Sequence, residues 1–267
     1  MTEPTYTESH KIAAHADPNG GKTHQIRFLI REYGHENVGI VSGEHGLGTI
    51  RGDVREEQVF HVNCVEDANL AFKWAKEKYA RPDAWICMDG ATGIMQMLAN
   101  GHFAKADAAM EHIVLKPGAP LPLELKIYQR FVTCNSGIYN VDMQQLYGLL
   151  GRQAERFWSA WVRAPWNIYA NFWTELTGHA GRERCMPWGP DVPGRMGLGA
   201  IKGSFDYIMK LEADNGGFNA TVRDNPRVTV TKMREDKDLG IDIPDVIKNF
   251  NIVDFVKALT PTKGEKA

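Results

Sequence analysis

A glycine-rich segment near the start of the chain limits its possible folds more than any other feature. Residues 16–23 read Ala-Asp-Pro-Asn-Gly-Gly-Lys-Thr, which matches the pattern G-x-x-x-x-G-K-[ST] except that Ala16 stands at the first glycine. A mostly apolar run at residues 11–15 precedes the segment, and a helical pattern follows it. The apolar positions of that pattern are Ile26, Leu29, Ile30 and Tyr33. Strand, glycine-rich loop and helix in this order predict a loop whose backbone N–H groups surround a phosphate.

Two side chains at the end of this loop have expected tasks. Lys22 would reach the β and γ oxygens of a nucleotide, and the Thr23 hydroxyl would ligate Mg²⁺. The predicted nucleotide contacts are Asp17, Pro18, Asn19, Gly20, Gly21, Lys22, Thr23 and His24. The alternative is a glycine-rich turn in front of an ordinary helix that contains Lys and Thr by coincidence.

Apolar runs alternate with helical patterns beyond this loop. The expected strands cover residues 38–41, 59–62, 84–88, 167–173, 205–211 and 227–231. Residues 67–79 carry alanines and aromatic residues on one helical face and predict a helix. Such alternation is typical of crossover connections, so we expect an α/β fold with a mainly parallel sheet flanked by helices and antiparallel strands toward the C-terminus.

Other segments interrupt or extend this pattern. Residues 99–139 have a proline-rich middle and no sustained periodicity, which predicts an excursion with a loop at its tip. Residues 139–163 predict a long helix that Pro165 ends. The tryptophans expected in the core are Trp158, Trp161, Trp166 and Trp173. We expect an N-terminal tail at residues 1–10, one domain at 11–240, and short helices with a polar tail at 241–267.

Composition excludes several classes of protein. With 267 residues, 43% hydrophobic residues and 24% charged residues, the chain is neither a disordered protein nor a coiled coil. A formal net charge of -2 argues against a globally basic nucleic-acid coat, so any basic surface must be local. The four cysteines are widely spaced, and neither a signal peptide nor an 18-residue apolar run is visible. These features predict a cytoplasmic protein that does not span a membrane.

Two carboxylates follow predicted strands and have candidate roles beside the phosphate loop. Asp89 ends the apolar run 84–88, and ligands of open α/β sheets bind beyond the carboxyl ends of the strands. Asp89 and Thr23 are therefore predicted to meet at one Mg²⁺. Glu44 follows the second strand and could orient or deprotonate an attacking water. The alternatives are a simple turn residue for Asp89 and a loop acid without a role for Glu44.

Basic residues in the C-terminal half have two further candidate roles. Lys232 and Arg234 are two positions apart on a predicted strand, so both could reach a phosphate on a neighbouring subunit. The alternative for them is a solvated, charge-rich face. Residues 177–203 combine glycines, local positive charge and an aromatic ring, which suits single-stranded nucleic acid as well as a loop that contacts another subunit. The candidate DNA contacts are Arg182, Arg184, Trp188, Arg195 and Lys202.

Taken together, these motifs resemble the core of RecA-type ATPases. The resemblance rests on the phosphate loop, Glu44, Asp89 and the later Lys-x-Arg, and it covers residues 11–240. More narrowly, the chain is similar to phage-encoded RecA-like proteins of single-strand annealing and recombination. The compact length, the Asp-Val-Pro-Gly segment that ends at residue 194 and the run at 205–211 suggest this narrower group. The chain departs from the family pattern at two positions. Ala16 replaces the first glycine of the phosphate loop, and Gly90 follows Asp89 where a hydroxyl residue is common.

The resemblance implies an ATPase that works between subunits of a ring or filament. By that resemblance, Lys22 and Thr23 bind ATP and Mg²⁺, Asp89 completes the metal site, and Glu44 activates water. Lys232 and Arg234 would act in trans, and the DNA-contacting loops would lie around 99–139 and 177–203. The sensor residue near the γ-phosphate is left open, with three candidates: Asn171, Thr174 and Glu175.

The implied partners are single-stranded DNA, further copies of the chain and a single-strand-binding protein, in the cytoplasm of a host cell. Two alternatives remain at this point. One is a motor subunit of the packaging or helicase type, and the other is a nucleotide-gated scaffold with little turnover.

Overall fold

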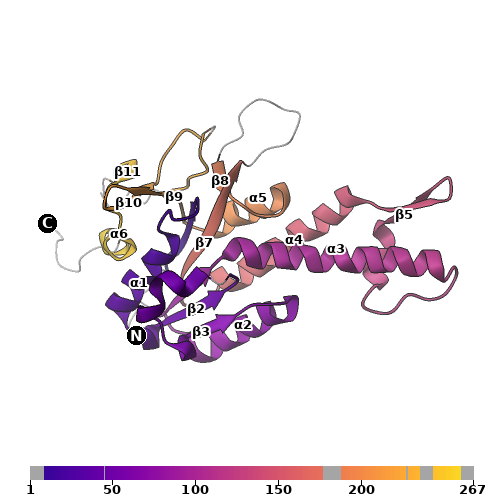
Figure 1. The fold of residues 1–267 in the computed structure, drawn as a ribbon, viewed down its shortest axis with the longest axis horizontal. Coiled ribbons are helices and arrows are strands. Elements are labelled where there is room, and N and C mark those ends of the chain that lie inside the picture. The colour runs from indigo at the N-terminus through magenta and orange to yellow at the C-terminus, as the bar shows by residue number, and fades with distance from the viewer. Residues whose placement is uncertain (1–8, 45, 177–187, 227, 235–242, 260–267) are drawn as a thin grey trace, which may run out of the picture.

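The computed structural model describes residues 9–44, 46–176, 188–226, 228–234 and 243–259 (Figure 1). Its main sheet has the strand order β11-β10-β9-β1-β7-β4-β2-β3, with β8 paired to β7. The parallel strands are β1 (Lys11–Ala16), β2 (Val38–Ser42), β3 (Val59–His61), β4 (Trp85–Asp89), β7 (Asn167–Leu176) and β9 (Tyr207–Asp214). The antiparallel additions are β8 (Trp188–Pro190), β10 (Gly217–Thr221) and β11 (Val246–Ile247). The expected α/β fold, with antiparallel strands near the C-terminus, is confirmed.

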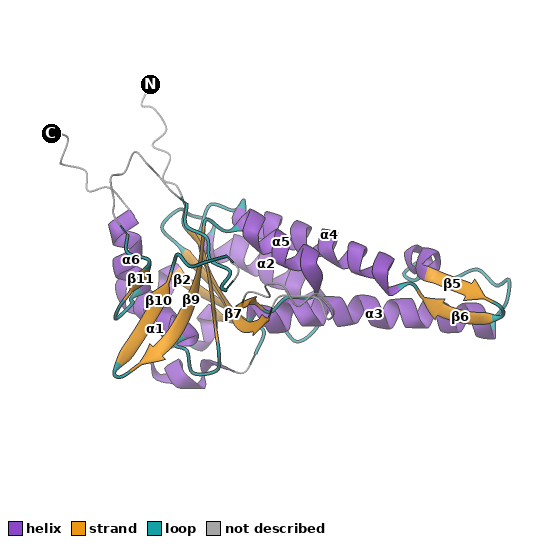
Figure 2. Ribbon diagram, turned by 90° about the horizontal axis from the view of Figure 1, so that it is seen from above, coloured by secondary structure: helices purple, strands orange, loops and turns teal. Residues whose placement is uncertain are grey.

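Helices cover both faces of this sheet (Figures 1 and 2). Helices α1 (Lys22–Tyr33) and α6 (Ile252–Leu259) lie on one face. The other face carries α2 (Val65–Tyr79), α3 (Ala91–Leu115), α4 (Met143–Val162) and α5 (Gly194–Ser204). Short 3-10 helices connect these elements at η1 (His35–Asn37), η2 (Gly46–Asp53), η3 (Glu56–Gln58) and η4 (Lys126–Phe131). Because both faces are covered, β1, β2 and β4 are buried along their whole length.

The core is divided by the sheet into two apolar clusters. On the side of α2 to α5, the rings of Trp158, Trp161 and Trp166 are at most 1% exposed. Trp158 packs against Phe172 and Phe205, and Trp161 packs against Trp166. The expectation of core positions is confirmed for these three tryptophans. Truncating such a ring to alanine typically costs 3–5 kcal/mol, so this cluster holds the helical layer on the sheet.

Helices α3 and α4 run far beyond the sheet as an arm that ends in a hairpin of β5 (Val132–Asn135) and β6 (Ile138–Val141) (Figure 2). The excursion expected at residues 99–139 lies in this arm, but residues 99–115, which showed no sustained periodicity, continue α3 as one alanine-rich helix. The proline-rich segment 116–122 is a loop, as expected. The arm has its own small core, made of Ala106, Ala109, Tyr128, Phe131, Leu146 and Leu149.

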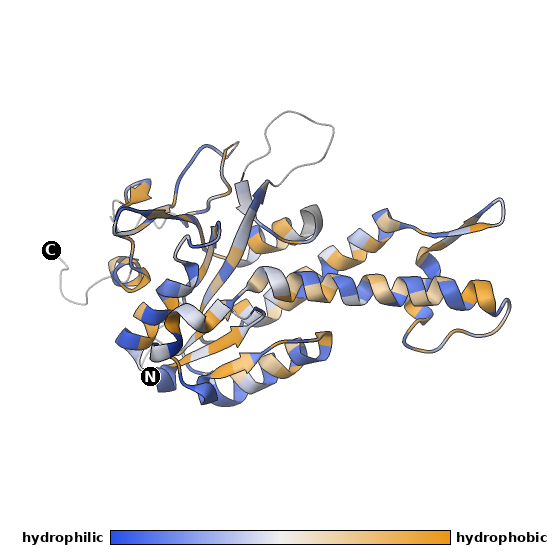
Figure 3. Ribbon diagram, in the orientation of Figure 1, coloured by the Kyte–Doolittle hydropathy of each residue, from blue (hydrophilic) through white to orange (hydrophobic). Residues whose placement is uncertain are grey.

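Figure 3 shows hydrophobic positions along the arm, and several large apolar side chains of the arm are exposed. They are Val114, Leu115, Leu123, Ile127, Ile138, Tyr139, Met143 and Tyr147. Exposed large apolar side chains gathered in one part of a molecule are typical of a contact with another molecule.

Three further boundaries differ from expectation. Residues 139–141 belong to β6, and α4 begins at Met143 because the Asp142 side chain accepts a hydrogen bond from the backbone N–H of Gln145. Residues 194–204, expected in a loop, form α5. The strand expected at 227–231 is replaced by isolated bridges, in which Thr229 pairs with Trp188 and Lys232 with Ile208.

The C-terminal segment packs on the same core as α1. Gln25 donates a hydrogen bond to the carbonyl of Phe250 at 3.3 Å and accepts one from the backbone N–H of Ile252 at 2.9 Å. Residues of α6 join the apolar cluster beneath α1. Within the described ranges, none of the helices has the length and apolar character that a membrane span needs.

Candidate functional site

The loop between β1 and α1 has a backbone that few residues can adopt. Asn19 has φ of 66° and Gly21 has φ of 87°, so the chain turns twice through the left-handed region. A Cβ placed at Gly20 would lie 2.5 Å from the Cβ of Ala16, which is completely buried. The missing side chain of Gly20 therefore makes room for the methyl group of Ala16. This contact explains how alanine fits at the first position of the loop.

Helix α1 begins without groups that would compete for an anion. Its N-cap residue is Gly21, no side chain caps it, and its first turn holds no acidic residue. By contrast, α4 is capped by the carboxylate of Asp142. The backbone N–H groups of the first turn, together with the positive end of the helix dipole, thus suit a phosphate.

Lys22 lies over this loop and is held by its carbonyl groups. Its Nζ donates hydrogen bonds to the carbonyl oxygens of Ala16 at 2.7 Å and Asp17 at 3.0 Å. Burial lowers the pKa of Lys22, and the charges of Glu44, Asp17 and Asp89 act in the opposite direction. The ammonium group can therefore exchange loop carbonyls for phosphate oxygens without moving to another part of the molecule.

Thr23, on the helix that follows β1, contacts Asp89 at the end of β4, although β1 and β4 are not adjacent in the sheet. The Thr23 hydroxyl donates to Oδ1 of Asp89 at 2.8 Å, and β7 lies between β1 and β4. Asn171, on β7, donates its amide to the same Oδ1 at 2.7 Å and accepts the backbone N–H of Gly90 at 2.6 Å. Burial raises the pKa of Asp89, while the two donors and Lys22 act to lower it. One carboxylate, 2% exposed, is thus fixed at the mouth of the loop.

Glu44 follows β2 and points to the same place. The indole Nε1 of Trp173 donates to its two carboxylate oxygens at 2.8 and 2.9 Å. A Cβ at Gly90 would lie 2.6 Å from the Cγ of Glu44, and one at Gly93 would lie 3.2 Å away. These two glycines leave the space that Glu44 occupies. Because the charge of Glu44 acts on Lys22, all four predicted groups, Lys22, Thr23, Glu44 and Asp89, belong to one site.

Trp173 is the clearest correction among the aromatic residues. It is 42% exposed and lies beside the site, with the Nζ of Lys22 5.8 Å from its ring centroid. Its expected place in the core is wrong, because β7 is buried only as far as Phe172 and its side chains are partly or fully exposed from Trp173 to Glu175.

Asn171 is the open γ-phosphate candidate that lies nearest to Asp89. Thr174 instead faces the completely buried His15, with its hydroxyl 3.1 Å from the ring Nδ1. Burial lowers the pKa of His15 to about 4, so this ring is neutral near pH 7. Glu175 points away from the loop.

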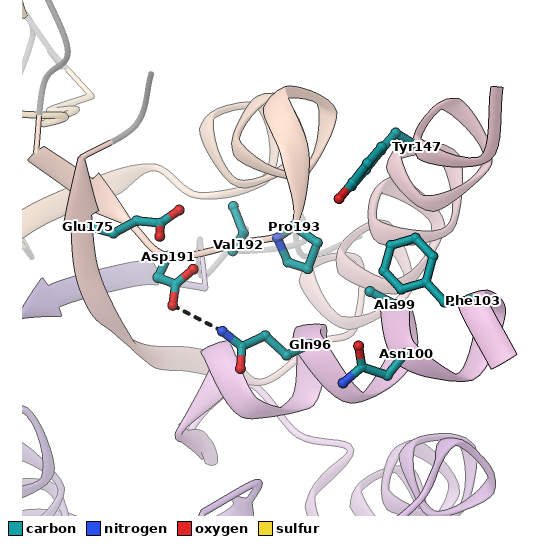
Figure 4. Close-up of a pocket in the computed structure, with 9 residues that line it drawn as sticks. All are labelled: Gln96, Ala99, Asn100, Phe103, Tyr147, Glu175, Asp191, Val192 and Pro193. Carbon is teal, nitrogen blue, oxygen red and sulfur yellow. Dashed lines mark hydrogen bonds between the residues drawn. The ribbon is translucent and has the colours of Figure 1, made fainter. Parts of the chain in front are cut away.

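A separate pocket of about 300 Å³ lies between α3, α4 and the end of β7 (Figure 4). Glu175 and Asp191 lie at one end of it, and Phe103 and Tyr147 lie at the other. Burial and the neighbouring Asp191 raise the pKa of Glu175. The pocket is joined to the site through Thr92, which accepts the backbone N–H of Trp173 at 2.9 Å and donates to the Asp191 carbonyl at 3.0 Å.

The two cations expected to act in trans bind within their own chain. The Nζ of Lys232 donates to the carbonyl of Lys202 at 2.8 Å and to that of Phe205. Arg234 lies 3.6 Å from the carboxylate of Asp206. Their action on a neighbouring subunit stays a prediction.

The five candidate DNA contacts are spread over several elements. Arg182 and Arg184 lie outside the described residues. Trp188 is 42% exposed in β8, and Lys202 is exposed on α5. Arg195 lies in the first turn of α5. Residues 188–190 and 194–203 therefore belong to a strand and a helix, which corrects the expectation of a loop there.

The donor set suits Mg²⁺ better than a transition metal. The Thr23 hydroxyl and the Asp89 carboxylate are hard oxygen ligands, and Mg²⁺ in phosphate sites is typically held by one or two such groups plus water and substrate oxygens. In the part of the chain that the structure describes, no group of three or more His, Cys, Asp or Glu side chains could hold a metal. The residues present fit a magnesium ion that arrives with a nucleotide.

No protein family model matches the chain, and no curated protein matches it.

Proposed function

We propose that the protein is a RecA-like P-loop ATPase that binds ATP with Mg²⁺ and acts with single-stranded DNA. The observation that carries the proposal is the 2.8 Å hydrogen bond between Thr23 and Asp89. These residues are 66 positions apart, and β1, which leads into the helix that carries Thr23, is not adjacent in the sheet to β4, which Asp89 ends. A hydroxyl at the start of a helix and a carboxylate at the end of a buried strand are the pair that a phosphate-bound magnesium ion requires.

The loop between β1 and α1, together with Lys22, would bind the phosphates of ATP. The first-turn N–H groups of α1 donate hydrogen bonds to the β-phosphate oxygens, and Lys22 turns from its loop carbonyls to the β and γ oxygens. Thr23 and Asp89 would hold Mg²⁺, whose charge offsets that of the triphosphate when it is bound. Asn171 keeps the Asp89 carboxylate in place for this task.

Hydrolysis is assigned to Glu44. Its carboxylate orients a water and takes its proton as the water oxygen attacks the γ-phosphorus in line. The new P–O bond forms while the bond to the β–γ bridging oxygen breaks, and ADP and phosphate are the products. Lys22 stabilises the negative charge on the transferred group. Trp173 fixes the Glu44 carboxylate through both of its oxygens.

Exposed side chains support the proposals of assembly and DNA binding. The apolar side chains at the outer end of the arm favour contact with a second copy of the chain. Trp188 and Lys202 are exposed and available to a single strand. A ring or filament would bring the site of one copy next to its neighbour.

One contact favours the alternative of a nucleotide-gated scaffold. Both oxygens of Glu44 accept from the indole of Trp173, and a contact that fixes a carboxylate in place is compatible with binding ATP without rapid turnover. A scaffold would bind ATP and assemble without rapid turnover.

The test combines turnover with direct binding. Steady-state ATP hydrolysis and calorimetric binding of Mg²⁺-ATP are measured for wild type, Lys22→Ala and Lys76→Ala, an exposed lysine of α2 that serves as the matched control. Loss of binding and turnover in Lys22→Ala alone is the expected result. Wild-type turnover in Lys22→Ala would overturn the assignment, and tight binding without turnover in wild type would select the scaffold.

A further inference from the structure

Three arginines form a basic stripe along the outer face of α4. Arg152 and Arg156 lie in the helix and Arg163 caps its C-terminal end. At 3.6 residues per turn the three positions fall within an arc of about 40°, and they span about 16 Å along the axis. All three side chains are exposed. The buried residues of α4, such as Ala154, Trp158 and Trp161, lie on the opposite side of the helix.

The stripe has little charge compensation. In the part of the chain that the structure describes, none of the three guanidinium groups takes part in an ion pair. Glu155 is the one acidic residue among the groups that line the surface depression beside them, which has a volume of about 510 Å³. Local positive charge on a chain of net charge -2 is the arrangement expected where a polyanion binds one face.

We infer that the phosphate backbone of single-stranded DNA lies along this stripe. The guanidinium group is suited to bidentate contacts with phosphate, and the spacing allows each arginine its own phosphate group. The stripe carries no aromatic side chain, so it contacts the backbone and reads no base. The inference depends on the proposed function for its partner, but it does not depend on ATP hydrolysis.

An anionic membrane is a less suitable partner for this face. Helices that lie on membranes carry large apolar side chains on the face that enters the lipid. The residues between the arginines are Glu155, Ser159 and Ala160, which offer no apolar surface of that kind. The helix α4 instead buries its apolar side against the sheet and α5. Phosphodiester groups in solution therefore fit the stripe better than a lipid surface.

Salt dependence provides a quantitative test. For single strands, each neutralised phosphate contributes about 0.7 to the slope of log affinity against log salt concentration. Replacing Arg152, Arg156 and Arg163 together by glutamine should therefore reduce that slope by about 2. At low salt the affinity for a labelled oligothymidylate should fall at least about tenfold. Lysine at the same three positions should retain most of the slope, because it keeps the charge.

The control variant removes the same charge elsewhere. Arg51, Arg55 and Lys248 are exposed and lie outside α4, and their replacement by glutamine should leave the slope unchanged. Fluorescence anisotropy titrations at several salt concentrations compare the variants, and circular dichroism confirms that each is folded. Equal slopes and affinities for wild type and the α4 glutamine variant would overturn the inference. So would α4-dependent binding to phosphatidylglycerol vesicles without binding to the oligothymidylate.

ATP hydrolysis separates this inference from the proposed function. In the absence of DNA, the α4 glutamine variant should hydrolyse ATP at the wild-type rate. If the wild-type protein does not bind ATP, the ATPase proposal is refuted. The oligothymidylate titrations would then test the arginine stripe by themselves.

Discussion

Replacing Asn171 by leucine should destabilise the protein in a manner that depends on the ionisation of Asp89. The substitution keeps the size of the side chain but removes the 2.7 Å donor to Asp89 and the 2.6 Å acceptor of the Gly90 N–H. A hydrogen bond to a charged group contributes about 1.5–3 kcal/mol, and a buried N–H left without an acceptor costs about 1–3 kcal/mol. At neutral pH the free energy of unfolding should therefore fall by about 2.5–6 kcal/mol.

The pH dependence identifies the carboxylate as the partner. The folded-state pKa of Asp89 is raised, so its contribution to stability is present in acid and is lost as the pH rises through that pKa. Loss of the Asn171 amide, which acts to lower this pKa, raises it further. The penalty of Asn171→Leu should therefore be larger at neutral pH than in mild acid. Urea unfolding at the two pH values measures both free energies.

Asn167 provides a matched control in the same strand. Its amide donates to the carbonyls of Pro82 and Ala84, and its oxygen accepts from the backbone N–H of His10. Asn167→Leu also breaks buried hydrogen bonds, but all of its partners are neutral, so its penalty should not change with pH over this range. A loss below about 1 kcal/mol in Asn171→Leu, or equal pH profiles in the two variants, would refute the role assigned to Asn171.

Three further changes test the site and its support. Trp173→Phe removes both hydrogen bonds to Glu44 and keeps an aromatic ring. The kcat should therefore fall about tenfold at unchanged KM, which corresponds to a rise of about 1.4 kcal/mol in the activation free energy. Unchanged steady-state kinetics would argue against a positioning role for Trp173. Gly21→Ala places a Cβ 2.2 Å from the Phe218 ring at φ of 87°, so calorimetry should detect no binding of ATP, and retained binding would contradict the proposed loop geometry. Burial lowers the pKa of Lys11 to about 8, so wild-type stability should rise between about pH 8 and 10 as this group loses its proton in the folded state. Lys11→Met should lack that rise in urea unfolding, and a rise of the same size in both proteins would exclude Lys11 as its source.

The order of strands and helices near the phosphate loop could be predicted because short apolar runs and turn residues carry that information locally. Strand β4 ends at Asp89, one residue beyond the expected run, and α2 and α4 begin within a few residues of their expected starts. The outer part of α3 could not be recognised in this way. Its alanines contact a small core of residues 128–149, so the helix shows no regular apolar face toward the sheet.

The site was predictable only where a motif fixes residue types and spacing. Lys22, Thr23, Glu44 and Asp89 lie together because the carboxyl ends of parallel strands share one edge of the sheet. Trp173 could not be found, because a tryptophan in an apolar run looks the same whether it faces the core or a carboxylate. Its exposure depends on where the covered part of β7 ends, which is a property of the tertiary structure.

The first residue of α3 follows directly after Gly90, whose backbone N–H is bound by Asn171 beside Asp89. Since α3 has 25 residues, it extends about 37 Å from this point without a break. One end of this helix therefore lies beside Asp89 and the other lies near the tip of the arm. A rotation of about 5° at that end displaces the hairpin at the other by about 3 Å, comparable to the shifts that repack subunit interfaces. A rigid rotation of α3 about its first turn would therefore move the hairpin at the far end of the arm.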